Sequence, residues 1–194
     1  HYLIHSYDAP PLANQGLNAA RRYADIAPAA PHALHMPSHI FTRIGSWQES
    51  AATNVRSRDV AKAGGEVDEA YHASDYMVYA YLQLARDAAA RQAIYEALQV
   101  DAVTSRFTAR YAKAAMPARY AFERGAWAEA AKLQPLGSPY PFVEAITYFA
   151  RSVGTARSGD LSSARKDAEQ LETLHNALLA AKNTYWATEV EVQR

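Results

Sequence analysis

The stretch that decides the fold reads MPSHIFTRIGSWQES at residues 36–50 and returns as MPARYAFERGAWAEA at residues 116–130, which is 80 positions further on (36 to 116). Two weaker copies share its small-residue turn. The four turn markers are Gly45, Ala85, Gly125 and Gly159, at spacings of 40, 40 and 34 residues. A glycine ends a helix in the left-handed conformation, and a small residue five positions later lets the next helix pack closely. The sequence therefore predicts a series of helical hairpins.

The hairpins imply an all-α protein, because no stretch alternates as a strand would. We expect hairpins near residues 1–27, 31–63, 67–100, 104–133 and 140–182. One hairpin cannot bury its apolar face alone, so neighbouring hairpins must stack. Pro37 and Pro117 fall inside expected helices and should bend them.

The glycine-x-tryptophan-x-x-small core at Gly45 and Gly125 resembles the tetratricopeptide repeat, over about residues 30–180. The resemblance implies an α-α superhelix, a right-handed solenoid forming a single domain over residues 1–194. Two of the spacings exceed the 34 residues usual in that family. The blocks HYLIH at residues 1–5 and HMPSHIF at residues 35–41 also resemble a group of bacterial tetratricopeptide proteins of unassigned function, so the resemblance implies a fold and little chemistry.

Composition limits the classes of partner. Hydrophobic residues make up 49% of the 194 residues and charged residues 21%, which is an ordinary globular mixture. Twenty basic residues balance twenty acidic ones, so the basic field that nucleic acid requires is missing and we expect no nucleic-acid partner. The chain has no cysteine, which excludes disulfides, thiolate metal sites and cysteine nucleophiles.

The ends of the sequence look like the ends of a fragment. The chain begins at His1 without a methionine and ends inside an expected helix over residues 184–194. We therefore expect a longer parent chain, and both cytoplasmic and periplasmic locations stay open. No apolar run has the length of a membrane span. Because the open ends of a repeat array expose apolar surface, two copies could also pair there as a homodimer.

Polar side chains recur in phase with the first two turns, at 13, 10 and 6 residues before the marker. They are His32, His35 and His39 before Gly45, and His72, Asp75 and Tyr79 before Ala85. Steps of three and four residues put each trio on one helix face. In the tetratricopeptide family, which the chain resembles, these positions line the concave groove. The predicted ligand groove consists of His32, His35, His39, Arg43, His72, Asp75, Tyr79 and Arg119.

A metal site is the competing interpretation of the same histidines. Two histidines four residues apart on a helix can chelate one ion, and imidazole suits zinc, nickel or copper. The candidate ligands are His1, His5, His35, His39, His72 and Asp75. The third interpretation is a buried polar network in which the imidazoles satisfy one another and the helix ends.

The sequence favours a binding module over an enzyme. No glutamate follows His35 as in zinc-helix metalloproteases, and neither a phosphate-binding glycine loop nor a Gly-x-Ser-x-Gly elbow occurs, so we predict no catalytic residues. The favoured function is a helical-repeat scaffold that binds a peptide, protein or small ligand in its concave groove and needs no cofactor. The alternative is a metal-binding protein or metal-dependent hydrolase that uses a divalent metal such as zinc.

Overall fold

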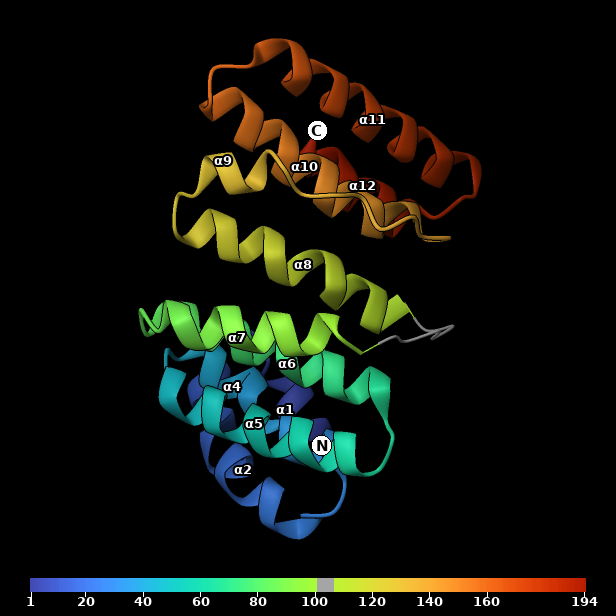
Figure 1. Cartoon of the computed structure of the whole chain (residues 1–194). Coiled ribbons are helices and arrows are strands. Elements are labelled where there is room, and N and C mark those ends of the chain that lie inside the picture. The colour runs from blue at the N-terminus through green and yellow to red at the C-terminus, as the bar shows by residue number, and fades with distance from the viewer. Residues whose placement is uncertain (101–106) are drawn as a thin grey trace. The chain divides into compact units, whose positions relative to one another are not determined.

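The computed structural model describes residues 1–100 and 107–194, and every regular element in these ranges is a helix (Figure 1). The all-α prediction is therefore confirmed for the described part of the chain. The helices divide between two compact units, His1–Ala112 and Lys113–Arg194. A single repeat domain over residues 1–194 stays a prediction.

The first unit contains both short and long helices. They are α1 (Tyr2–Ser6), α2 (Ala13–Ile26), α3 (Pro31–His35), α4 (Pro37–Arg43), α5 (Trp47–Ala63), α6 (Val67–Gln83) and α7 (Asp87–Leu98). Helix α8 (Phe107–Glu123) runs across the division. The second unit continues with α9 (Trp127–Ala130), α10 (Pro141–Arg157), α11 (Leu161–Ala180) and α12 (Thr184–Gln193). The first three residues of the hairpin expected near 104–133, which are residues 104–106, lie outside the described residues.

The predicted turn markers lie between helices, as the hairpin interpretation requires. Gly45, Gly125 and Gly159 have φ angles of 74°, 61° and 90°, and Ala85 has a φ of 55°. These are left-handed conformations, which glycine adopts without a steric penalty and alanine adopts at a cost. The phase of the hairpins read from the sequence is therefore confirmed at all four turns.

The two prolines act differently. Pro117 lies inside the continuous helix α8, as expected. Pro37 divides its helix instead of bending it: α3 ends at His35, and α4 begins at Pro37, where the missing N–H has no intrahelical partner to lose. Met36 between them keeps helical angles, φ −48° and ψ −40°, so His35 and His39 stay one turn apart on the same side.

The first unit has an apolar core beside a polar one. Ile4, Ala20, Met36, Ile40 and Phe41 are all buried where α1, α2 and α4 meet. Helix α5 adds a different stripe, because its side chains Ser50, Asn54 and Ser57 are also completely buried. Buried polar groups require hydrogen-bond partners, and Ser57 finds one by donating through Oγ to the carbonyl oxygen of Pro31 at 2.8 Å. This polar stripe of Ser50, Asn54 and Ser57 connects α5 to α3 by hydrogen bonds, through Ser57 to Pro31 and through Asn54 to His35.

None of the helices in the described ranges has the length and the apolar character needed to cross a membrane. This finding agrees with the expectation from hydropathy.

Candidate metal centre

Six histidines of the first unit gather in one cluster, although they come from the chain start, α1, α3, α4 and α6. Among the described residues, two groups of three histidines bring one ligand nitrogen each to within 4.8 Å of one another. We call His35, His39 and His72 the inner triad, and His1, His5 and His32 the outer triad. Of the phased positions, His35, His39 and His72 converge in the inner triad, and His32 joins His1 and His5.

The inner triad joins three helices. His35 ends α3, His39 lies one turn further along in α4, and His72 comes from α6. The Nε2 atoms of His35 and His39 are 3.1 Å apart. The ring of His72 lies against that of His35, with centroids 4.2 Å apart.

His35 is held by a hydrogen bond from within the polar stripe of α5. Its side chain is fully buried, and its Nδ1 lies 2.7 Å from Oδ1 of Asn54. The amide nitrogen of Asn54 donates to the carbonyl oxygen of Ser50 at 2.8 Å, which leaves its carbonyl oxygen facing the imidazole. A carbonyl oxygen only accepts, so Nδ1 of His35 carries the proton and Nε2 carries a lone pair.

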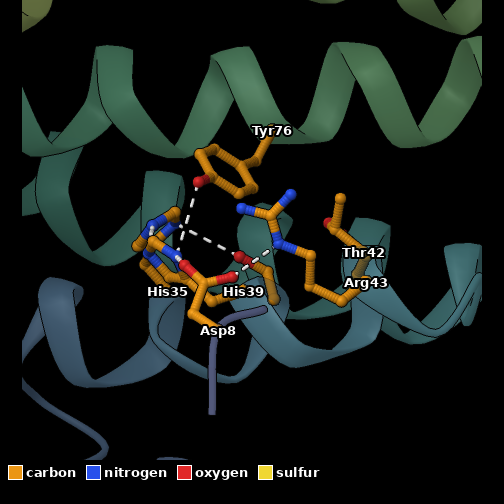
Figure 2. Close-up of polar contacts among 8 residues, drawn as sticks. Asp8, His35, His39, Thr42, Arg43 and Tyr76 are labelled. Carbon is orange, nitrogen blue, oxygen red and sulfur yellow. Dashed lines mark hydrogen bonds and ion pairs between the residues drawn. The ribbon is translucent and has the colours of Figure 1, made fainter. Parts of the chain in front are cut away.

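The Nδ1 atom of His39, like that of His35, lies beside an oxygen acceptor (Figure 2). Its Nδ1 lies 2.8 Å from Oδ2 of Asp8, while Oδ1 of Asp8 accepts from Nε of Arg43 at 2.7 Å. The hydroxyl of Tyr76 approaches the same Nδ1 at 3.4 Å. A carboxylate only accepts, so Nδ1 of His39 is the protonated nitrogen and its Nε2 also carries a lone pair.

Two nitrogen lone pairs therefore face each other across 3.1 Å. Neither neutral ring can donate to the other, so the contact is stabilised only by a shared cation, which is either a proton or a metal ion. Two nitrogens bound to one tetrahedral zinc at 2.0–2.1 Å are about 3.3 Å apart. The observed separation is close to that value.

Burial disfavours the proton. Desolvation lowers the pKa of His35 well below 6.5, and the neighbouring His72 and His39 lower it further. Desolvation also lowers the pKa of His39, against the opposing effect of Asp8, and it lowers the pKa of His72. The inner triad is consequently a set of neutral imidazoles, which is the form that binds metal.

These shifts predict how stability depends on pH in a metal-free sample. The three depressed pKa values contribute stability that is complete above the ordinary value of 6.5 and is lost as pH falls toward the folded-state values. His32 acts oppositely, because its hydrogen bond to Glu69 raises its pKa. Three histidines have lowered pKa values and one has a raised pKa, so the lowered values should dominate. We therefore expect the free energy of unfolding, measured by urea titration with a chelator present, to decrease as the pH is lowered from about 7.5 to 5.5.

The control for this experiment is His72→Gln, which removes one of the three groups and should reduce the slope. A free energy of unfolding that rises on acidification would show that the triad is protonated in the folded protein, contrary to the burial argument.

The outer triad lies directly beside the inner one. His1 and His5 are one helical turn apart, with ring centroids 4.7 Å apart, and the ring of His32 lies 5.3 Å from that of His1. The Nδ1 atom of His32 lies 3.3 Å from Oε2 of Glu69. His5 is exposed, whereas every member of the inner triad is at least partly buried.

The remaining predicted site residues lie around the cluster or away from it. Asp75 is buried on α6 but belongs to neither triad; desolvation lowers the pKa of His72, and the charge of Asp75 opposes part of that shift. Tyr79 packs edge-on against Trp47, with ring centroids 5.4 Å apart. Arg43 is paired with Asp8. Arg119 is a residue of α8 in the second unit.

Two residues that orient the rings were not among the predicted site residues. Asp8 followed the pair His1 and His5 in the sequence, but nothing indicated that it would reach His39. Asn54 was missed although a signal existed: Ser50, Asn54 and Ser57 recur at steps of four and three on a helix whose other inward residues are small.

The arrangement matches a known feature of metal sites, in which each ligating histidine donates its other ring N–H to a carboxylate or carbonyl oxygen. Asn54 and Asp8 supply these acceptors for His35 and His39. No family model, curated protein or solved structure matches the chain.

Proposed function

We propose that this protein binds a divalent transition-metal ion, of the zinc class, through His35, His39 and His72. The observation that supports the proposal best is the pair of Nε2 atoms 3.1 Å apart, each belonging to a ring whose Nδ1 is already bound to an acceptor. The backing acceptors fix both tautomers and both ring orientations before an ion arrives. Two unprotonated nitrogens held this close are unfavourable without a cation between them. The geometry therefore favours a metal site over a polar network that binds no ion.

The choice of metal follows from the donor atoms. Three neutral imidazoles favour zinc, nickel or copper, whereas magnesium and calcium prefer oxygen ligands. Three protein ligands leave at least one coordination position of a tetrahedral ion for water or for a donor atom of a bound molecule. The bound ion would thus have an open coordination position at which it could carry or activate a small ligand.

The peptide-binding groove is supported less well by the contacts. His39 and Arg43 both engage Asp8, and Tyr79 packs against Trp47. The phased left-handed turns support tetratricopeptide-like hairpins, and we propose that these build the α-α superhelix implied by the resemblance. A peptide or protein partner, and a homodimer through the ends of the array, stay predictions.

Replacement of His72 tests the proposed metal site. His72 is the least constrained member of the inner triad, because the hydrogen bonds that hold His35 and His39 do not involve it. We expect His72→Ala to fold and to bind zinc more weakly, by more than the roughly 10–100-fold that loss of an outer-shell partner costs. Calorimetric titration of the chelator-treated 194-residue chain with zinc measures the tightest class of site.

The matched control is His175→Ala, which removes a histidine of α11 that lies 3.6 Å from Glu191 in the second unit. This variant should bind zinc like the original protein. Equal zinc affinity in all three proteins, or no zinc binding by the original protein, would contradict the proposed function.

A further inference from the structure

We propose that the outer triad, His1, His5 and His32, binds a second divalent metal ion, which makes the cluster a two-metal centre. The inference deepens the proposed function and depends on it for the first of the two ions. The outer triad meets the same geometric condition as the inner one, since three ligand nitrogens from separate side chains lie within 4.8 Å of one another. Two of these histidines are one helical turn apart, the spacing at which a single helix chelates one ion.

The outer triad also has an acceptor behind one of its rings. Nδ1 of His32 lies 3.3 Å from a carboxylate oxygen of Glu69, a residue of α6. When Nδ1 donates to that carboxylate, Nε2 is the nitrogen left for an ion. The pair His32 and Glu69 thus repeats the relation between His39 and Asp8, and the two carboxylates offset part of the charge that two dications bring.

The two triads are immediate neighbours. The rings of His5 and His39 have centroids 5.5 Å apart, and those of His32 and His35 have centroids 6.1 Å apart. His32 and His35 are also successive inward positions of one short helix. Two ions bound by these triads would therefore occupy adjacent sites in one cluster.

Access differs between the two triads. A cavity of about 630 Å³ has one member of the outer triad, His1, in its wall, together with residues that include Ile4, Arg22, Tyr23 and Asp25. His5 is exposed, whereas His35 in the inner triad is completely buried. The second ion should therefore exchange faster and be removed first by a chelator, and a ligand reaching the centre would meet it first.

Metal analysis of the whole 194-residue chain after zinc loading and desalting tests the proposal. We expect two zinc equivalents in the original protein, one tight equivalent in His5→Ala, and one weak equivalent in His72→Ala. His5→Ala should fold normally, because His5 is exposed. His175→Ala should keep both equivalents. Copper(II) loading adds a readout of distance: the two-copper protein should show electron-spin coupling in its resonance spectrum, and one-copper His5→Ala should not.

The outcomes separate the two proposals. One zinc equivalent in the original protein that persists in His5→Ala overturns the second ion and leaves the inner site intact. A single equivalent that is lost in His5→Ala and kept in His72→Ala overturns the inner site instead. Two copper ions without spin coupling would show that the second ion lies elsewhere, which also overturns the two-metal centre.

Discussion

Zinc at about 1,000 times its dissociation constant is expected to raise the free energy of unfolding by about 4 kcal/mol, because an ion that binds only the folded state stabilises it by mass action. His35→Ala is expected to remove the part of this increment that the ion at the inner triad supplies. His35 is the central ligand: it is completely buried, its Nε2 faces that of His39 at 3.1 Å, and its ring contacts that of His72. The measurement is urea unfolding with zinc and with a chelator.

The quantity to compare is the zinc-dependent increment, not the absolute stability. His35→Ala leaves a cavity and removes the donor that pairs with Oδ1 of Asn54, so the metal-free variant should itself be less stable by about 1–3 kcal/mol. His175→Ala should keep the full increment. A His35→Ala protein that zinc stabilises as much as the original would show that the ion binds elsewhere.

The all-helical character and the positions of the four turns could be predicted from the sequence because their signals are local. Each left-handed turn is specified by one small residue and its neighbours, and the turns at Gly45, Ala85, Gly125 and Gly159 adopt the expected conformation. Helix periodicity placed His35 and His39 on one side of one hairpin for the same reason. The break at Pro37 was the local error, since a proline is compatible with both a bent helix and a new helix start.

Which residues form each triad could not be predicted, because the answer depends on distances between side chains of different hairpins. Spacing assigns residues to a helix face but does not say how far each side chain reaches or which faces meet. Asp75 was expected to join His72, yet it belongs to neither triad, and His32 joins His1 and His5 instead. Asp8 reaches His39 and Arg43 only because α1 packs beside α4.

The metal-site and polar-network interpretations of the histidines are compatible with each other. The hydrogen bonds from His35 to Asn54 and from His39 to Asp8 are those a buried polar network would use. In a polar network without a metal, each acceptor would face a donor. Here the Nε2 atoms of His35 and His39 are both acceptors, and they face each other. The polar network is therefore best understood as the support of the proposed metal site.

The second unit provides a large effect of a different kind, at the crossing of α9 and α10. A Cβ atom added at Gly154 would lie 2.5 Å from the backbone nitrogen of Ala131 and 2.8 Å from the carbonyl oxygen of Trp127. Backbone atoms cannot rotate away, so α10 would have to separate from α9. We expect Gly154→Ala to lower the free energy of unfolding by about 1–3 kcal/mol, typical of an overpacked core, although alanine gains up to about 1 kcal/mol in helix propensity.

Gly16→Ala is the matched comparison in the first unit. There the added Cβ meets Cδ1 of Ile40 at 2.8 Å and Cβ of Tyr7 at 3.1 Å. Both are side-chain atoms and not backbone atoms of a packed helix, so the loss in urea unfolding should be smaller. Zinc affinity should be unchanged in Gly154→Ala, because every proposed ligand belongs to the first unit. If Gly154→Ala were as stable as the original protein, the close contact between α9 and α10 would be wrong. If it lost zinc affinity as well, the second unit would have to influence the metal centre.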